Sequence, residues 1–216
     1  ARDMMHYIGG LSSPSFAHAL LVGVGYPTTS KEAISLRFYD LTPPPGTGTP
    51  SRPAGGGDEF IRLLLDDVKP FVASRFNVDS LRQAIFGKSL GGLTVLRIML
   101  RHPAAFSTYI AASPSIQVGE RAVLKDIGPF AERTKAGDLN IRLLVTVGGV
   151  ESDSMMTNTS DFVTNLNSLN LKGVIATHVV LPDENHNTVS LSSLSRAMSF
   201  GLPPLSATSQ PNPAGK

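Results

Sequence analysis

The fold of this chain is decided at residues 83–92, which read Gln-Ala-Ile-Phe-Gly-Lys-Ser-Leu-Gly-Gly. Residues 83–87 have the length and the apolar content of a short buried strand. Residues 90–101 predict a helix, because leucines recur on one face at helical spacing. A Gly-x-Ser-x-Gly sequence between a strand and a helix is the context of a nucleophile elbow. The stretch therefore predicts a reactive serine on a sharp turn.

The residues of this turn suit a nucleophile. Gly87 and Gly91 are expected to keep side chains out of the tight turn around Ser89. Gly92 should allow the helix to pack closely on its neighbours. The turn places the Ser89 hydroxyl beside the helix N-terminus, whose dipole favours a developing oxyanion. We expect the backbone N–H of Leu90 to donate one hydrogen bond to that oxyanion.

Outward from this turn, strand-like and helix-like segments alternate. Strands are predicted at 19–24, 83–87, 106–112, 141–147 and 175–181, and helices at 59–75, 90–101, 122–135, 161–169 and 191–200. This alternation predicts an α/β fold with a mostly parallel sheet covered by helices on both faces. Residues 1–200 are expected to form a single domain, and residues 201–216 a disordered tail.

Two details concern the helix at 59–75 and the segment before it. Residues 42–57 are rich in proline and glycine and predict a long loop. Asp58 is the expected N-cap of the helix, and Pro70 is expected to kink the helix or to end its first part.

Composition excludes several function classes. The 216 residues carry a net charge of +2 from scattered charges, so a nucleic-acid partner is not expected. No apolar run approaches the roughly 20 residues that a membrane-spanning helix needs. The absence of cysteine excludes thiolate catalysis and cysteine-ligated metals, and it leaves the compartment open between periplasm and cytoplasm.

A serine nucleophile needs a base, and the chain has five histidines. His186 is the best candidate, because it lies in the polar stretch 183–187 between the last strand and the last helix. It also comes after the serine, as the order serine, acid, histidine requires. Glu151 and Asp153 follow the strand at 141–147 and are the candidate acids, with Glu151 favoured. A Ser–His dyad without a carboxylate stays open.

With these residues placed, the chain resembles the enterobactin-esterase-like branch of the putative esterase family, in the α/β-hydrolase superfamily. The resemblance covers most of the chain and lies in these segments besides the elbow: 22–26 (Val-Gly-Val-Gly-Tyr), 37–43 (Arg-Phe-Tyr-Asp-Leu-Thr-Pro), 56–60 (Gly-Gly-Asp-Glu-Phe), 111–115 (Ala-Ala-Ser-Pro-Ser), 149–151 (Gly-Val-Glu) and 184–186 (Glu-Asn-His). It implies a serine esterase that opens ferric catecholate siderophore trilactones through an acyl-enzyme, without metal or cofactor. It also implies that Ser89 is the nucleophile, that His186 is the base and that Glu151 stands where the family has a glutamate.

The chain departs from that family in two places. Lys88 stands before the serine, where many members have histidine, and it either affects substrate preference or points to solvent. Residues 1–7 read as the middle of a helix, which predicts that the chain is the C-terminal part of a longer one. We expect an upstream segment to supply a strand between the strands at 19–24 and 83–86, together with a second oxyanion donor.

Arg37 and the loop 43–57 are candidates for the rim of a small-molecule ester site, where a guanidinium meets an anionic ferric catecholate. An ordinary surface ion pair is the alternative for Arg37. A general carboxylesterase for small acyl, aryl or sugar esters is an alternative activity. A non-catalytic binding module that keeps the fold is the alternative from another class.

Overall fold

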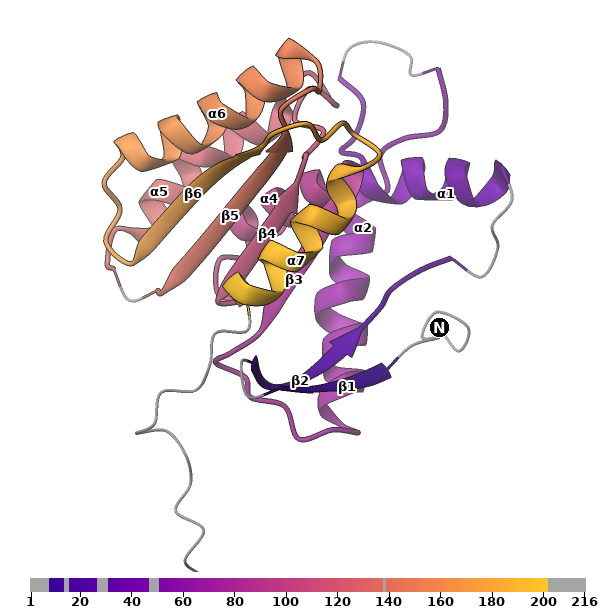
Figure 1. The fold of residues 1–216 in the computed structure, drawn as a ribbon, viewed down its shortest axis with the longest axis vertical. Helices are drawn as coiled ribbons and strands as arrows, with labels where there is room; N and C mark the ends of the chain where they lie inside the picture. The colour runs from indigo at the N-terminus through magenta and orange to yellow at the C-terminus, as the bar shows by residue number, and fades with distance from the viewer. Residues whose placement is uncertain (1–7, 14–15, 27–30, 47–50, 138, 202–216) are drawn as a thin grey trace, which may run out of the picture.

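The main sheet of the protein is parallel and follows the chain order. In a computed structural model, which describes residues 8–13, 16–26, 31–46, 51–137 and 139–201, it has the order β3-β4-β5-β6 (Figure 1). The strands are β3 (Ala84–Lys88), β4 (Thr108–Ala112), β5 (Ile141–Gly148) and β6 (Val174–Leu181). All three pairings are parallel, so the carboxyl ends of the four strands lie at one edge of the sheet.

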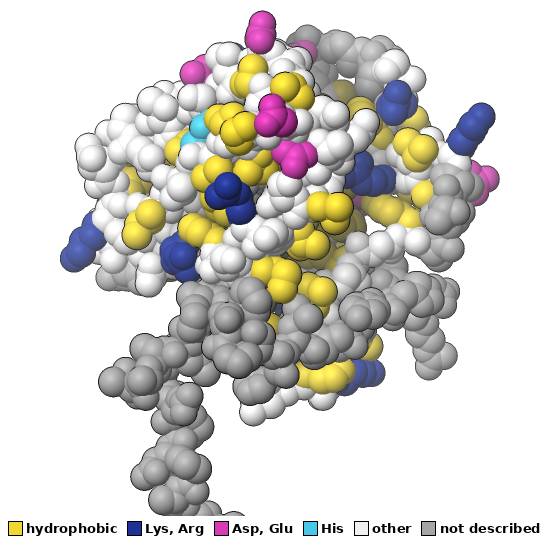
Figure 2. Space-filling model, viewed as in Figure 1, with side chains coloured by type: hydrophobic (Ala, Val, Ile, Leu, Met, Phe, Trp, Pro, Cys, Tyr) yellow, Lys and Arg dark blue, Asp and Glu magenta, His cyan; other side chains and the backbone are white. Residues whose placement is uncertain are grey.

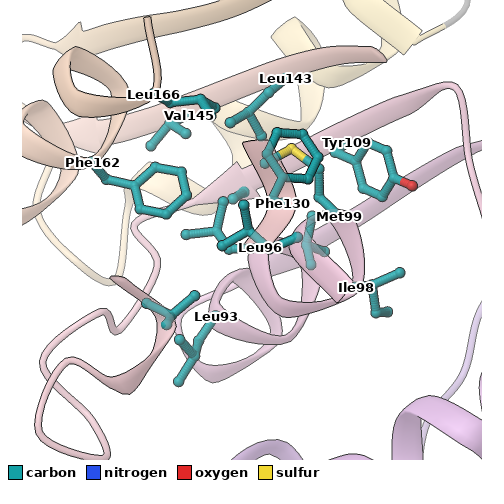
Figure 3. Packing of buried hydrophobic residues seen from close by; sticks show 14 of the residues in the cluster. Leu93, Leu96, Ile98, Met99, Tyr109, Phe130, Leu143, Val145, Phe162 and Leu166 are labelled. Carbon is teal, nitrogen blue, oxygen red and sulfur yellow. The ribbon is translucent and has the colours of Figure 1, made fainter. Parts of the chain in front are cut away.

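Helices cover both faces of this sheet, as the sequence predicts. The larger core joins one face to α4 (Leu90–Arg101), α5 (Ile127–Thr134) and α6 (Asp153–Ser168), and its buried side chains include Leu96, Tyr109, Phe130, Val145 and Phe162 (Figure 3). The other face is covered by α7 (Val189–Gly201) (Figure 1). Ala197 of α7 packs there against Ile110 and Leu144. The side chains of β4 alternate between the two cores, which is why each of its residues is buried.

The helix predicted at 59–75 is continuous, but its turns are not uniform. It comprises α2 (Gly57–Arg62), a π-helical segment (Leu63–Val68) and α3 (Lys69–Ala73). Pro70 does not end it; the wider π turn precedes the proline, and the chain continues as α3. The π turn accommodates a proline that would otherwise disrupt the helical hydrogen bonds.

The expected N-cap at Asp58 is wrong. Asp58 lies inside α2, and its side chain makes no capping hydrogen bond. Its carboxylate instead accepts hydrogen bonds from Arg97 and, at 2.9 Å, from Arg101. Arg97 lies on α4 and is almost fully buried. A buried guanidinium requires a partner, so the ion pair fastens α2 to the helix that follows the elbow.

The sequence predicts a buried strand of the main sheet at 19–24, and the structure differs from this prediction. β2 (Phe16–Val22) pairs antiparallel with β1 (Ile8–Ser13) in a separate two-stranded sheet, and half of the Leu21 surface is exposed. β1 was not predicted; a strand close in sequence pairs more readily with β2 than a distant one does. Within the described residues, β3 pairs with β4 alone.

Other elements differ from the predictions mainly at their ends. α1 (Lys31–Leu41) was not predicted, because its apolar residues do not gather on one face. α6 begins eight residues earlier than predicted, at Asp153, and residues Ala122–Asp126 form a 3-10 helix ahead of α5. The predictions for residues 1–7 and for the tail at 202–216 lie outside the described residues.

The surface carries dispersed charges on the face seen in Figure 2, where basic and acidic side chains stand apart among polar and apolar ones. The absence of a nucleic-acid partner stays a prediction. None of the helices in the described part of the chain is both long enough and apolar enough to cross a membrane.

Candidate active site

Ser89 lies on a strained turn between β3 and α4. Its backbone has φ 58° and ψ −118°, a conformation that residues with side chains seldom adopt. Three backbone hydrogen bonds hold it there: the Ser89 N–H donates to the Ala112 carbonyl at 2.9 Å, and the Ser89 carbonyl accepts from the Leu93 N–H at 3.0 Å and from the Ser115 N–H at 3.1 Å. The turn thus anchors the nucleophile candidate to β4 on one side and to α4 on the other.

The glycines around this turn differ in how strongly the fold requires them. A Cβ at Gly87 would lie 2.3 Å from the Gly91 carbonyl oxygen, so no side chain fits there. A Cβ at Gly92 would lie 3.0 Å from Pro114 Cα, which confirms the expected close packing. The expectation for Gly91 is wrong for the described residues, because a Cβ there meets nothing within 4 Å.

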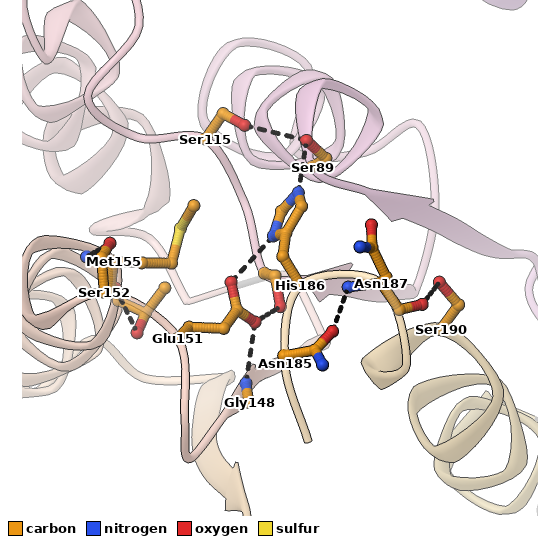
Figure 4. A network of polar contacts seen from close by, with 12 residues as sticks. Ser89, Ser115, Gly148, Glu151, Ser152, Met155, Asn185, His186, Asn187 and Ser190 are labelled. Carbon is orange, nitrogen blue, oxygen red and sulfur yellow. Dashed lines mark hydrogen bonds and ion pairs between the residues drawn. The ribbon is translucent and has the colours of Figure 1, made fainter. Parts of the chain in front are cut away.

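His186 is aimed by the turn that begins α7. The Asn185 side-chain oxygen accepts from the backbone N–H groups of Asn187 at 2.8 Å and Thr188 at 3.2 Å, and the Asn185 N–H donates to the Thr188 hydroxyl at 3.0 Å. This reciprocal pattern satisfies N–H groups that a helix start leaves unpaired. It directs the imidazole toward the elbow, where His186 Nε2 lies 3.1 Å from Ser89 Oγ (Figure 4).

Glu151 is buried behind the imidazole. Its Oε2 lies 2.8 Å from His186 Nδ1, and its Oε1 accepts from the Gly148 N–H at 2.9 Å and from the Ser113 hydroxyl. Burial acts to raise the pKa of Glu151, but the hydrogen bonds from Ser113, Gly148 and His186 outweigh it and hold the pKa below its ordinary value. The carboxylate is therefore kept ionised although only 2% of its side chain is exposed.

The structure brings Glu151 to His186 and leaves Asp153 apart. Asp153 is exposed in the first turn of α6. The ionised Glu151 accepts a hydrogen bond from His186 Nδ1–H, so Nδ1 carries the imidazole proton and Nε2 is left as the acceptor for the hydroxyl of Ser89. This is the geometry in which a histidine removes a proton from a serine and then holds it.

The N-terminus of α4 faces the same edge of the sheet. Leu90 is the first residue of α4, so its N–H has no acceptor within the helix. That free donor stands next to Ser89, where the helix dipole also favours negative charge. The expected role of Leu90 as an oxyanion donor is compatible with this position.

The predicted rim residues lie beside the elbow. Arg37 projects from α1, and its Nη2 donates to the Lys88 carbonyl at 3.3 Å. Lys88 is partly exposed. The Tyr26 hydroxyl donates to Asp40 at 2.9 Å, and the Arg52 guanidinium lies 4.9 Å from the centre of the Phe38 ring. The Arg37 contact thus holds α1 next to the residue that precedes the nucleophile, and the Arg52–Phe38 contact joins the proline-rich loop to α1.

Two residues of the site escaped the sequence reasoning. Ser113 and Ser115 follow β4 and are buried, and Ser113 has a positive φ of 42°. Ser113 contacts Glu151, and Ser115 Oγ lies 3.1 Å from Ser89 Oγ. Their position directly after a strand of a parallel sheet was the signal that could have found them.

The described residues include no group of three histidine, aspartate or glutamate side chains that could hold a metal ion. The chemistry that the site supports is instead proton transfer and nucleophilic attack. A parallel sheet with a serine on a strand-to-helix turn, a histidine after the last strand and a buried glutamate defines an α/β-hydrolase site.

Comparison with known proteins agrees with that class. The chain belongs to the family described as "Putative esterase", whose match covers residues 17–181. It is 36% identical to ferri-bacillibactin esterase BesA of Bacillus subtilis over 86% of this chain and 68% of that protein. It is 37% identical to a siderophore enterobactin esterase of Emericella nidulans over 54% of this chain and 42% of that protein. The fold class and the enzyme class, a serine ester hydrolase, are thereby confirmed.

Solved structures give the same result. The structure of the BES protein from Bacillus cereus superposes with a TM-score of 0.80 at 28% identity, over 87% of this chain and 73% of that one. The chain thus spans about two thirds to three quarters of these bacterial relatives and less than half of the fungal one.

The first prediction concerns Ser89. Ser89→Ala removes one hydroxyl from a turn held by backbone bonds, so folding should persist while esterase turnover falls about a thousandfold or more. Turnover of p-nitrophenyl acetate and labelling by a fluorophosphonate both measure this. A variant that keeps wild-type turnover would show that Ser89 is not the nucleophile. A wild-type chain that takes no label would favour the non-catalytic module.

A second prediction distinguishes triad from dyad. Glu151→Gln removes the charge that stabilises the protonated imidazole, so kcat should fall roughly a hundredfold or more. Asp153→Asn is the matched control two residues away and should leave kcat unchanged. If Asp153→Asn is the damaging change, the acid is Asp153; if neither matters, His186 works without a carboxylate.

Proposed function

We propose that this chain hydrolyses the ester bonds of a ferric catecholate siderophore that is a trilactone. In this proposal Ser89, His186 and Glu151 form the catalytic triad. The observation that carries the proposal is the continuous hydrogen-bonded chain from Ser89 Oγ through His186 to the buried Glu151. The names of the relatives, which are siderophore esterases, support the substrate class.

In the acylation step, His186 Nε2 takes the proton of the Ser89 hydroxyl as Oγ attacks the ester carbonyl carbon. The imidazolium that forms is stabilised by the ionised Glu151, which accepts a hydrogen bond from Nδ1–H and does not take its proton. The Leu90 N–H binds the oxyanion of the tetrahedral intermediate. His186 then gives its proton to the departing alcohol, and the acyl group stays on Ser89.

In the deacylation step, water takes the place of the alcohol. His186 removes a proton from water, the hydroxide oxygen attacks the acyl carbon, and the bond from that carbon to Ser89 Oγ breaks. The proton on His186 returns to Ser89, which restores the resting site. Both steps need the same free lone pair on Nε2, which the Glu151 contact provides.

We assign the substrate preference to Arg37 and Lys88, two basic residues at the rim of the site. Arg37 is held against the Lys88 carbonyl, so its positive charge stands beside the nucleophile instead of moving freely in solvent. A fixed guanidinium beside a strand end favours a large anionic ligand over a small neutral ester. Lys88 adds a second positive charge at the position next to Ser89.

The substrate class is tested by comparing kcat/KM for a ferric trilactone siderophore and for neutral p-nitrophenyl acetate. Arg37→Ala should raise KM for the anionic trilactone about tenfold, the size of a charge-assisted contact, and leave p-nitrophenyl acetate unchanged. Arg75→Ala, which removes an exposed arginine at the end of α3, is the control. If Arg37→Ala lowers kcat/KM equally for both substrates, Arg37 has only a structural role. If the wild type prefers the neutral ester, the enzyme is a general carboxylesterase.

We propose further that a strand from an upstream segment of the full-length protein pairs with the free edge of β3 and brings the second oxyanion donor. Within the described residues β3 has β4 as its one partner, and Phe86 is 39% exposed. Residues 84–87 of β3 carry no charge, and a strand whose edge is unpaired and unprotected by charges normally has a neighbour. At the same turn, no atom of the described residues lies within 4 Å of a Cβ at Gly91, which leaves room for that strand.

Hydrogen exchange tests this arrangement. The amides of β3 that face away from β4 should exchange quickly in the 216-residue chain and slowly in the full-length protein, whereas the amides bonded to β4 should be protected in both. Direct hydrogen bonds between β2 and β3 in an active enzyme made of this chain alone would overturn the proposal.

A further inference from the structure

Ser115 holds a hydroxyl against the proposed nucleophile. It lies in the turn after β4, with 6% of its surface exposed, and its Oγ is 3.1 Å from Ser89 Oγ (Figure 4). Its backbone is fixed on both sides, because the Ser115 N–H donates to the Ser89 carbonyl at 3.1 Å and the Ser115 carbonyl accepts from the Val118 N–H at 3.1 Å. The hydroxyl is therefore placed by backbone contacts and not by a mobile loop.

The direction of this hydrogen bond follows from the rest of the site. The ionised Glu151 accepts a hydrogen bond from His186 Nδ1–H, so Nε2 carries no proton and accepts a hydrogen bond from the hydroxyl of Ser89. Ser89 Oγ then has no proton left for Ser115. The Ser115 hydroxyl must therefore be the donor and Ser89 Oγ the acceptor. One lone pair of Ser89 Oγ receives this bond, and the other is free for the substrate carbon.

We propose that Ser115 is a further catalytic residue, which donates a hydrogen bond to Ser89 Oγ and stabilises that oxygen when it leaves the acyl group during deacylation. This inference rests on the proposed acyl-enzyme mechanism. As the bond between the acyl carbon and Ser89 Oγ breaks, the electron pair stays on Oγ, and His186 supplies the proton. Ser115 keeps its own proton throughout and only shares it in the hydrogen bond.

The two half-reactions differ in how much they need this bond. In deacylation the leaving oxygen is Ser89 Oγ itself, and hydrogen bonds to developing charge are the strong ones. In acylation Ser89 Oγ is the attacking atom. A hydrogen bond donated to it stabilises the negative charge that develops as its proton leaves, but the same bond makes the oxygen a weaker nucleophile. The two effects on the acylation rate therefore offset each other. The leaving oxygen of acylation belongs to the substrate alcohol. Removal of the Ser115 hydroxyl should therefore slow deacylation more than acylation.

A purely structural role predicts something different. Ser115→Ala removes the hydroxyl but keeps the backbone bond from residue 115 to the Ser89 carbonyl, so the elbow should keep its shape. A scaffold defect would distort the elbow in every site and would slow both half-reactions alike. The ratio of the two rate constants separates the alternatives.

The test is pre-steady-state hydrolysis of p-nitrophenyl acetate, with sites counted by fluorophosphonate labelling. Ser115→Ala should release one nitrophenol per labelled site in the burst, as the wild type does, and should deacylate on the order of tenfold more slowly. The acetyl-enzyme should accumulate and be found on Ser89 by mass spectrometry. Ser115→Thr, which keeps a hydroxyl, should recover most of the deacylation rate, and Ser168→Ala, an exposed serine at the end of α6, should behave as wild type.

An unchanged deacylation rate in Ser115→Ala would overturn the assignment, and so would equal slowing of both half-reactions. Because rates are taken per labelled site, partial misfolding of a variant does not alter the outcome. If the wild type forms no adduct at Ser89, the proposed function itself fails. If the wild type forms the adduct and Ser115→Ala deacylates normally, only the role of Ser115 is lost.

Discussion

The sharp turn at Ser89 is the constraint on which the rest of the site depends. A residue with a side chain is held at φ 58° because its N–H is bonded to the end of β4 and its carbonyl to α4. The cost of such a conformation, about 1–3 kcal/mol, is met by packing on both sides. That packing is extensive, since nearly all of α4 is buried and the Arg97–Asp58 pair fastens it to α2. A rigid helix behind the turn keeps the hydroxyl where the histidine can reach it.

The buried carboxylate of Glu151 imposes a second requirement. Hydrogen-bond donors of the protein must replace the water molecules that would otherwise solvate it. A carboxylate with 2% of its side chain exposed would take up a proton unless donors replaced the lost water. The Ser113 hydroxyl and the Gly148 N–H supply those donors on one oxygen, so the other stays available to His186. Ser113 and Gly148 therefore contribute to the orientation of the imidazole by keeping the carboxylate of Glu151 ionised.

The sequence allowed prediction of the parts that depend on local pattern. The elbow, the strand ends and the loop with His186 carry strong local signals, and Glu151 followed from its place after β5. The choice between Glu151 and Asp153 depended on where α6 begins, and helix starts are poorly determined by sequence. Ser113 and Ser115 escaped because a serine after a strand is common and its partner lies far away in the chain. β2 was misplaced because an apolar strand does not reveal which strand it pairs with.

The order of the strands explains why the two serines that follow β4, Ser113 and Ser115, belong to the site. Ser89, Ser113 and Ser115, Glu151, and His186 follow β3, β4, β5 and β6 in turn. Neighbouring strands are about 4.8 Å apart, so a histidine after β6 can reach a serine after β3 only if its loop folds back over the end of β5. The loop does this: a Cβ at Gly148 would lie 2.3 Å from the Glu184 carbonyl oxygen, and the Val150 N–H donates to that oxygen at 3.1 Å. Because β4 lies between β3 and β5, the residues that follow it lie between the nucleophile and the acid. The short turn after β4 can therefore contact both the acid and the nucleophile. Its Ser113 contacts Glu151, and its Ser115 contacts Ser89.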